Sequence, residues 1–396
     1  METKQATHPG SSTINGATAV DSAHRGIQVL HVGKFYPPHM GGIETHLRDL
    51  CSELRKSVDL RVVVANNDRT MIEETLDGVS VTRVPTWATL VSTPLCPDLI
   101  ARIREFRGDI LHLHFPNPMA VLAYLASGFR GSMVVTYHSD MVRQKILGPL
   151  FEPLLHAALR RSAAIIATSP NYLGTSRVLA EHQDRCHVIP LGIPIENFGQ
   201  SKPGAAAAVR REFGDNLIVS VGRLVYYKGF EYLIRAMPRV PGKLLIVGEG
   251  PLRAKLGALA SELGVAEKVI FLGKIDHDRL VACYHASQVF VLASIARSEA
   301  FGIAQIEAMA AGLPVVNTNL DSGVPFVSIH RQTGLTVPPA DPEALAEAIN
   351  ELLGNAELRA SLGHAAERRA VEEFSLESMA SRTLSVYEGV VQRRNA

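Results

Sequence analysis

Two glutamates and a basic pair have the residue types that bind a phosphorylated sugar. Glu299 lies in a predicted loop, and Glu307 lies in the helix predicted to follow it. Carboxylates accept paired hydrogen bonds from vicinal hydroxyls, which ribose and hexose both offer. Arg223 and Lys228 follow a predicted strand, and they offer a planar fork and a point charge to phosphate oxygens. Taken singly, each is equally well explained as an exposed charge; together they predict one ligand that carries phosphate and hydroxyls.

Two predicted helix starts could bind the anionic part of such a ligand. Phe301, Gly302 and Ile303 open the helix that holds the second glutamate. Free backbone N–H groups and the helix dipole favour an anion at that position. Gly41 and Gly42 follow the first predicted strand, where glycine permits a close backbone approach and the start of a phosphate-facing helix. The alternative for this glycine pair is a simple turn.

Two weaker motifs have ordinary structural explanations. Gly248-Glu-Gly250 lacks the third glycine of the dinucleotide fingerprint, so a tight strand-to-helix turn and a contact with the ligand both stay open. Asp276-His-Asp278 matches a D-x-D metal pattern, but it follows a predicted strand and precedes a helix. Asp276 is therefore predicted to be an N-cap, and we assign no metal ligand.

Histidines cluster near the ends of two predicted strands. His112 and His114 share one face of a strand, but no third ligand is evident from the sequence. Zinc requires three or four ligands, so we predict that this pair has a packing role. His138 ends the next strand, where it is either a satisfied structural histidine or part of a site.

Strands and helices alternate from Ile27 onward, which is typical of parallel sheets with helices on both faces. Two openings repeat the order strand, Val-Gly-Lys/Arg, aromatic loop, glycine and helix, so we predict two Rossmann-like domains with the site between them. The predicted division is a disordered leader (1–25), a first domain (26–195), a linker (196–216), a second domain (217–374) and a C-terminal helix (375–396) that returns to the first domain.

The composition excludes several classes of protein. The 396 residues include 40 Lys and Arg against 39 Asp and Glu, a formal charge of +1, so no nucleic-acid partner is expected. The four cysteines are far apart and include no C-x-x-C pair, which indicates a reducing cytosol and no zinc site. No apolar segment predicts a secretory signal or a membrane-spanning helix. A cytoplasmic enzyme is therefore expected.

Several motifs together resemble glycosyltransferase family 4, whose members are retaining enzymes of the two-domain GT-B type. The resemblance extends from Ile27 to the C-terminus, and it rests on Gly41-Gly42-Ile-Glu44, Arg223 with Lys228-Gly229, the GEGP sequence at Gly248, and Glu299 with Glu307. It implies an α/β fold of the GT-B type, with two Rossmann-like domains whose parallel sheets face each other across a crevice.

The resemblance also implies a role for each site residue. Arg223 and Lys228 would hold the diphosphate of a nucleotide-sugar donor. Glu307 would hold the ribose and Glu299 the hydroxyls of the sugar, and the amides of residues 301–303 would contact the distal phosphate and the sugar. His138 would match the active-site histidine of the family. The departing phosphate assists the reaction in this family, so no protein nucleophile, metal or other cofactor is expected.

Segments of the first domain are similar to bacterial O-antigen and exopolysaccharide transferases, several of which use GDP-mannose. The segments are LHLHFPNPMAVLAYL, VVTYHSDMVRQK, ATSPNYL and CHVIPLGI. We therefore expect mannosyl transfer from GDP-mannose to a saccharide or polyprenol-linked saccharide in cell-surface polysaccharide synthesis. The alternatives are a UDP-glucose or UDP-N-acetylhexosamine donor, a nucleotide-sugar epimerase, and a non-catalytic sensor.

One apolar and basic segment is ambiguous between a surface and a core position. Residues 141–161 carry basic residues on both sides of an apolar run that contains two prolines. The segment either lies on an anionic membrane, at the inner face of the cell membrane, or forms a core helix whose ends reach solvent.

Overall fold

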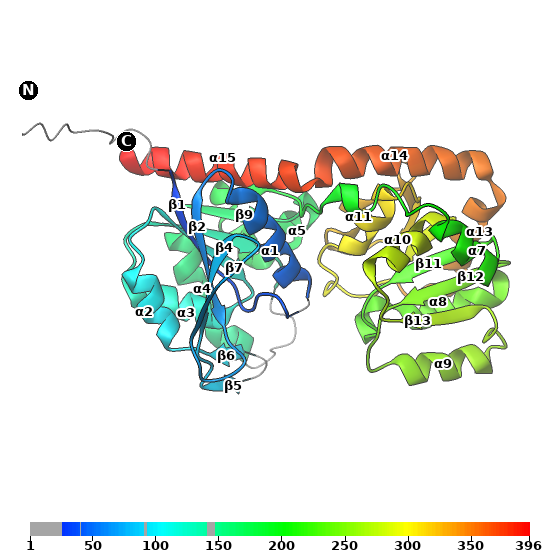
Figure 1. Ribbon diagram of the computed structural model, residues 1–396, viewed down its shortest axis with the longest axis horizontal. Helices are drawn as coiled ribbons and strands as arrows, with labels where there is room; N and C mark the ends of the chain where they lie inside the picture. The colour runs from blue at the N-terminus through cyan, green and yellow to red at the C-terminus, as the bar shows by residue number, and fades with distance from the viewer. Residues whose placement is uncertain (1–25, 40, 91–92, 141–146) are drawn as a thin grey trace, which may run out of the picture.

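The computed structural model describes residues 26–39, 41–90, 93–140 and 147–396, with residues 147–150 described only as backbone. The predicted leader 1–25 lies outside these residues, as do residues 141–146 of the apolar and basic segment. Two sheets flanked by helices lie side by side along the molecule (Figure 1).

The first sheet has the strand order β10-β9-β8-β7-β1-β2-β4-β3. Apolar side chains of the inner strands alternate between two cores; in β1, Val29 enters one core and Leu30 the other. The strands are β1 (Gln28–Val32), β2 (Asp59–Ala65), β3 (Ile72–Leu76), β4 (Val79–Val84), β7 (Ile110–Phe115), β8 (Ser132–Tyr137), β9 (Ala164–Ala167) and β10 (Cys186–Val188); β5 (Ala88–Leu90) and β6 (Thr93–Leu95) form a separate hairpin.

The second sheet has the order β13-β12-β11-β14-β15-β16, and its paired strands are all parallel. It too is covered by an apolar core on each face. The strands are β11 (Leu217–Val221), β12 (Lys243–Val247), β13 (Val269–Gly273), β14 (Val289–Leu292), β15 (Val315–Thr318) and β16 (Gly334–Val337).

The helices pack on the faces of both sheets, as the strand–helix alternation predicts. They are α1 (Gly42–Leu54), α2 (Asp98–Glu105), α3 (Pro118–Ser127), α4 (Leu147–Arg161), α5 (Pro170–Thr175), α6 (Arg177–Ala180), α7 (Ala205–Phe213), α8 (Phe230–Ala236), α9 (Arg253–Glu262), α10 (His277–Ala286), α11 (Ile303–Ala310), α12 (Val324–Val327), α13 (Pro342–Gly354), α14 (Ala356–Phe374) and α15 (Leu376–Asn395). Within the described residues, no helix is both long and apolar enough to cross a membrane.

The edge strand β3 of the first sheet was not predicted from the sequence. There β3 runs antiparallel to β4, whereas the other strand pairs of this sheet are parallel, as expected. Asp77 and Gly78 connect the two strands with φ angles of 50° and 77°, the left-handed backbone that a two-residue hairpin turn requires. An Asp-Gly pair between β-rich segments signals such a hairpin, so the sequence contained this information.

Two chain crossings connect the domains. Ile193 lies in a parallel bridge with Ser375, its N–H donates to the carbonyl of Phe374, and its carbonyl accepts from the N–H of Leu376. Before this bridge, α14 lies along the second domain, and after it α15 lies along the first (Figure 1). Tyr387 and other buried side chains of α15 share a core with α1 there. The C-terminal helix therefore supplies one wall of the first domain.

Candidate active site

Lys228 and Glu299 form a buried ion pair at the carboxyl ends of two adjacent strands. Lys228 follows β11, and Glu299 lies in the loop between β14 and α11. Lys228 Nζ lies 2.7 Å from Glu299 Oε2, and the two side chains are only 14% and 9% exposed. The Ser294 hydroxyl donates to the same carboxylate oxygen over 3.0 Å. A ligand that reaches one member of this pair therefore meets the other.

The pKa of the Lys228 ammonium reflects two opposing effects. Burial alone would lower it, but the neighbouring Glu299 carboxylate outweighs burial, so the pKa is raised and the charge is retained at neutral pH. The turn that carries Lys228 ends at Gly229, whose φ is +67°. A Cβ there would lie 1.9 Å from the carbonyl oxygen of Ala293, so only glycine lets the turn approach β14 this closely.

Arg223 and Gly248 lie beside this turn. Arg223 is exposed and forms no ion pair within the described part of the chain. A Cβ on Gly248 would lie 2.2 Å from the Gly222 carbonyl oxygen, so Gly248 is needed for close packing of two strand ends. This packing supports the turn explanation of Gly248, and its contact with a ligand stays a prediction.

The N-terminus of α11 faces the N-terminus of α1 across the boundary between the domains. Gly302 caps α11 in a left-handed conformation with φ +77°, and Phe301 before it is buried. The first amides of a helix have no intrahelical acceptor, so those at Ile303 can donate to an anion. A Cβ built on Gly42 would lie 3.8 Å from Ile303 Cδ1, and Gly41 is the N-cap of α1. The two predicted glycine sites therefore approach each other.

Glu307 lies inside α11 and is held from the neighbouring helix. The Tyr284 hydroxyl of α10 donates to Glu307 Oε2 over 2.7 Å. Burial raises the pKa of the Glu307 carboxyl, while this hydrogen bond and the more distant charges of His277 and Lys228 oppose the shift. Glu307 keeps a second oxygen that can accept from a ligand hydroxyl.

His138 follows β8 and is only 5% exposed. Its Nε2 lies 3.3 Å from Nδ1 of His114, and the ring of His46 packs edge-on against it with centroids 4.8 Å apart. Burial holds the pKa of His138 well below 6.5. At neutral pH it is therefore an uncharged imidazole that can orient a ligand but is not a strong acid.

Arg297 connects the loop of Glu299 to the first domain. Its Nη1 donates to the Thr175 carbonyl over 3.0 Å, and its Nη2 lies 3.3 Å from Asp140 Oδ2. The guanidinium also lies over the Tyr172 ring, 4.9 Å from its centroid. This contact sets the position of the second-domain loop relative to the carboxyl ends of the first sheet.

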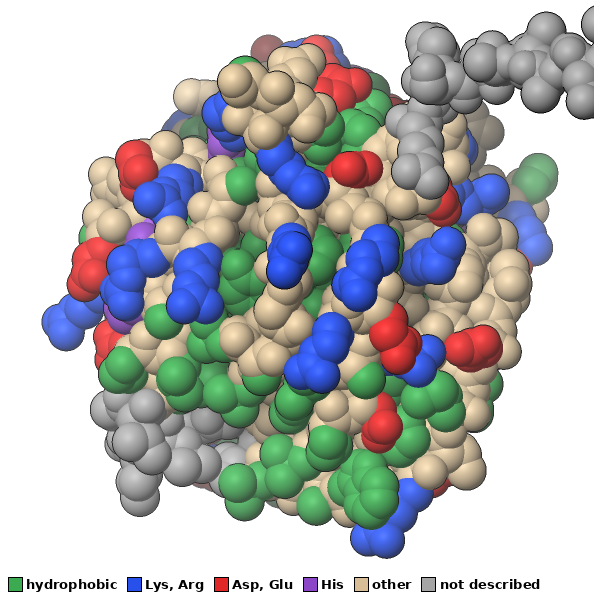
Figure 2. Space-filling view, turned by 90° about the vertical axis from the view of Figure 1, so that its left-hand side faces the viewer, with side chains coloured by type: hydrophobic (Ala, Val, Ile, Leu, Met, Phe, Trp, Pro, Cys, Tyr) green, Lys and Arg blue, Asp and Glu red, His purple; other side chains and the backbone are tan. Residues whose placement is uncertain are grey.

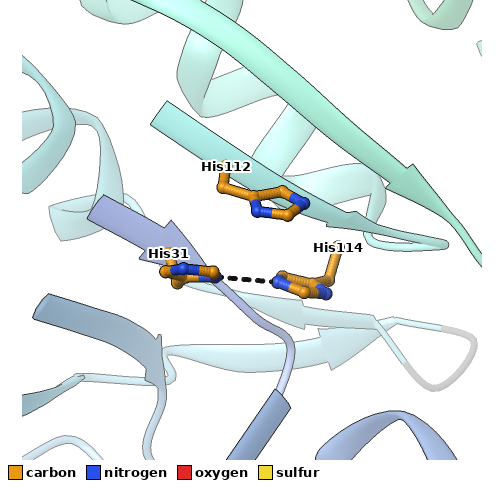
Figure 3. Close-up of side chains that lie close together, drawn as sticks. All are labelled: His31, His112 and His114. Atoms are coloured by element: carbon orange, nitrogen blue, oxygen red, sulfur yellow. Dashed lines mark hydrogen bonds between the residues drawn. The ribbon is translucent and has the colours of Figure 1, made fainter. Parts of the chain in front are cut away.

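The two patterns considered for metals have different outcomes. Asp276 is confirmed as the N-cap of α10, because its side chain accepts from the Arg279 N–H over 2.8 Å. Asp278 instead pairs with Lys202. No third ligand beside His112 and His114 was evident from the sequence, but the fold brings His31 beside both, on the neighbouring strand β1 (Figure 3).

Several residues at this site were missed by the sequence analysis. Ser294 and Tyr284 fix the two glutamates, Arg297 joins the domains, and His31 and His46 complete a histidine cluster. None belongs to a motif, and each acts through a contact made by chain folding. His46 has a partial signal, since it lies one helical turn after Gly42 and so faces the same side.

Two family models match the chain. The model described as "Glycosyltransferase Family 4" matches residues 40–197, and the model described as "Glycosyl transferases group 1" matches residues 206–369. The first match ends with η2 (Ile195–Asn197) and the second begins within α7, so the gap between them is the stretch where the chain passes into the second domain.

Curated relatives and solved structures agree with these matches. The chain is 33% identical to the D-rhamnosyltransferase WbpZ of Pseudomonas aeruginosa, over 88% of this chain and 92% of that protein. It is 31% identical to the O-antigen chain mannosyltransferase C of Escherichia coli, over 93% of this chain and 100% of that protein. It is 29% identical to a GDP-mannose-dependent phosphatidylinositol monomannoside mannosyltransferase of Mycolicibacterium smegmatis, over 93% of this chain and 100% of that protein. The sucrose-phosphate synthase structure from Thermosynechococcus elongatus superposes with a TM-score of 0.79 at 24% identity. The superposition covers 93% of this chain and 100% of that one, and the likeness concerns the fold.

Proposed function

Since the chain belongs to glycosyltransferase family 4 and has the GT-B fold, we propose that it transfers a mannosyl group from GDP-mannose with retention of configuration. The acceptor is a saccharide or a polyprenol-linked saccharide in the assembly of a cell-surface polysaccharide. The activities named for the Escherichia coli and Mycolicibacterium smegmatis relatives support the mannosyl group, and the name of the latter supports the GDP donor.

The observation that carries this proposal is the buried Lys228–Glu299 pair beside the N-terminus of α11. Breaking the glycosidic bond places negative charge on the departing diphosphate. Lys228 and the amides at the start of α11 are fixed positive groups that stabilise this charge without reorganisation, and exposed Arg223 offers a guanidinium to phosphate oxygens. In this assignment Glu299 accepts hydrogen bonds from the sugar hydroxyls and Glu307 from the ribose hydroxyls, so the two carboxylates bind different parts of the donor.

Neutral His138 completes the proposed site from the first domain. Because burial keeps it uncharged, it acts by donating or accepting one hydrogen bond at the donor sugar or the incoming hydroxyl. No protein nucleophile is assigned, and the departing phosphate assists the attack. The cationic groups described above replace a metal ion, so we propose that the reaction needs no metal or other cofactor.

Two substitutions test this assignment. Lys228→Ala and Glu299→Ala should each lower the turnover of GDP-mannose by about a hundredfold or more, because each removes a fixed group at the charge that develops. Lys202→Ala is the matched control, since Lys202 also pairs with a carboxylate but is exposed and is not assigned to the donor site. Full activity in both site variants would contradict the assignment.

A donor screen separates the alternatives. We expect GDP-mannose to raise the melting temperature and to be consumed with an acceptor, and EDTA to leave turnover unchanged. Preference for UDP-glucose or a UDP-N-acetylhexosamine would overturn the assignment of the donor but leave the assignment of a glycosyl transfer unchanged. Release of an altered sugar nucleotide without an acceptor would indicate an epimerase, and binding without any turnover would indicate a sensor. Loss of activity in EDTA would indicate that the reaction requires a metal ion.

We also propose that the enzyme contacts an anionic membrane through the first domain, in order to reach a lipid-linked acceptor. Leu155, Ala158 and Leu159 of α4 are buried, so one face of this helix belongs to the core, whereas Leu154 is exposed. Figure 2 shows Lys and Arg side chains above apolar ones at the lower end of this domain, where the β5–β6 hairpin lies in Figure 1. Trp87 is among the exposed apolar side chains beside this hairpin.

Vesicle flotation tests the membrane proposal. Binding to vesicles that contain phosphatidylglycerol should be lost on Leu90→Asp, which places a charge on the exposed hairpin. Val371→Asp, on the exposed side of α14, is the matched control and should bind as the unmodified protein does. Equal binding by both variants, or no binding by the unmodified protein, would exclude this surface.

A further inference from the structure

A row of imidazoles connects the end of β8 to the C-terminal helix. His114 Nδ1 lies 3.3 Å from His138 Nε2, and His114 Nε2 lies 3.0 Å from His31 Nδ1. Figure 3 shows the second of these contacts, which joins β7 to β1. His31 Nε2 in turn lies 3.3 Å from the hydroxyl of Tyr387 on α15.

The row continues past the tyrosine. The Tyr387 hydroxyl also lies within hydrogen-bond distance of His112 Nδ1, and His112 Nε2 lies 2.7 Å from Thr136 Oγ1. No side chain in the row is more than 5% exposed. In order, this histidine row consists of Thr136, His112, Tyr387, His31, His114 and His138.

The direction of the hydrogen bonds in the row is constrained. A neutral imidazole has one donor nitrogen and one acceptor nitrogen, and the Tyr387 hydroxyl has one hydrogen, whose partners within the described residues are His112 and His31. Every group between the two ends of the row therefore has a partner for its hydrogen only if all the hydrogens point the same way. Burial keeps the imidazoles neutral: it lowers the pKa of His31 to about 3 and holds those of His112 and His114 well below 6.5. The hydrogens therefore point either toward His138 or toward Thr136.

The threonine end favours one direction. If the hydrogens pointed toward Thr136, its own hydroxyl hydrogen would need a further acceptor, and within the described residues its one hydrogen-bond partner is His112. A buried donor without an acceptor shifts such an equilibrium by about tenfold or more. In the other direction Thr136 donates to His112, and each group donates to the next. His138 then accepts at Nε2 and carries its hydrogen on Nδ1.

We propose that Tyr387, His31 and His114 are positioning residues that hold His138 as the Nδ1–H tautomer. The inference rests on the proposed function, which places His138 at the donor sugar or the incoming hydroxyl. In this form His138 Nδ1 is a hydrogen-bond donor, so it binds an oxygen lone pair and cannot remove a proton. The proposed role of His138 is therefore to orient an oxygen atom, not to act as a general base.

A metal ion is the competing explanation of this cluster, because nitrogens of His46, His114 and His138 lie within 4.8 Å of one another. The ring geometry favours hydrogen bonds. The His114 and His138 rings are inclined by only 20°, and their centroids are 5.6 Å apart. The two nitrogens, 3.3 Å apart, therefore lie on the line between the centroids and point directly at each other. Metal ligands instead direct their lone pairs to a third point. His114 also uses both nitrogens within the row.

A pair of similar-sized substitutions at His114 tests the proposal. His114→Leu removes the link, whereas the amide of His114→Asn can still donate to His138 Nε2. The Leu variant should lose about tenfold in kcat with little change in the KM for GDP-mannose, and the Asn variant should recover most of this loss. Selective 15N labelling of histidine should report Nδ1–H at His138 in the unmodified protein and in the Asn variant, and mixed tautomers in the Leu variant.

Controls on α15 and at His138 separate a structural effect from the proposed one. Val390→Ala opens the same core as Tyr387 and should lower the melting temperature without changing kcat or the tautomer, whereas Tyr387→Phe should change the tautomer. Equal kcat in both His114 variants, or an Nε2–H signal in the unmodified protein, would overturn this inference alone. Full activity of His138→Ala would overturn the proposed role of His138 as well. Stoichiometric bound zinc would overturn the hydrogen-bonded row.

Discussion

Lowering the pH from 7 to 5 should strongly destabilise this protein, because it buries a cluster of uncharged imidazoles. Burial lowers the pKa of His31 to about 3 and of His46 to about 4. Burial also holds the pKa values of His112, His114 and His138 well below 6.5. As the pH falls below 6.5, the unfolded chain binds protons that the folded protein does not, so stability is lost.

The expected loss follows from these shifts. A histidine that stays neutral in the folded protein costs about 2 kcal/mol of unfolding free energy between pH 7 and pH 5, so His31 and His46 together cost about 4 kcal/mol. The other three imidazoles act in the same direction. Glu307 and Asp49 act in the opposite direction, because burial raises their carboxyl pKa values and a raised carboxyl pKa adds stability as the pH falls, but the five imidazoles outnumber them. Whole proteins are stable by about 5–15 kcal/mol, so the loss is large.

Urea unfolding and thermal melting at pH 7, 6 and 5, at constant ionic strength, measure this effect. The melting temperature should fall by about 10 °C or more between pH 7 and pH 5. His46→Gln removes an imidazole whose nitrogens have no hydrogen-bond partner in the described structure, so it should weaken the pH dependence by about one proton. His364→Gln, on an exposed part of α14, is the control and should leave the slope unchanged.

A small effect would refute the reasoning. If the unfolding free energy changed by less than about 1 kcal/mol from pH 7 to pH 5, the imidazoles would not stay neutral in the folded protein. The same result would remove the basis for a hydrogen-bonded row of neutral histidines. A steep pH dependence that persisted unchanged in His46→Gln would place its origin elsewhere in the molecule.

Three further substitutions test the site and its framework. Arg297→Ala removes the contacts with the first domain and should raise the KM for the donor about tenfold in steady-state kinetics; an unchanged KM would exclude this coupling. Tyr284→Phe deprives Glu307 of its hydrogen-bond donor and should weaken nucleotide binding about tenfold in calorimetry; equal affinity would argue against a ribose role. Gly229→Ala should destabilise the protein by more than about 2 kcal/mol in thermal melts, because a Cβ meets a backbone oxygen, whereas Gly354→Ala, with open space around it, should not.

Local signals in the sequence predicted much of the fold. The alternation of apolar strands and helices predicted parallel sheets in the GT-B arrangement, and this fold class is confirmed. Asp276 was correctly predicted as an N-cap, because a cap depends on residues within one turn of each other. The Asp77-Gly78 hairpin was equally local, and it was missed although the turn chemistry was present.

The sequence also supplied the chemistry of the site, since side-chain type decides which groups can hold phosphate or hydroxyls. Tertiary structure alone decided which groups meet. Lys228 contacts Glu299 because β11 and β14 are neighbours, and Tyr387 reaches His31 because α15 returns to the first domain, 356 residues further along the chain. A strand pattern specifies which face is buried but not which strand or helix will cover it. The sequence therefore determined the donors and acceptors, and the path of the chain determined their pairing.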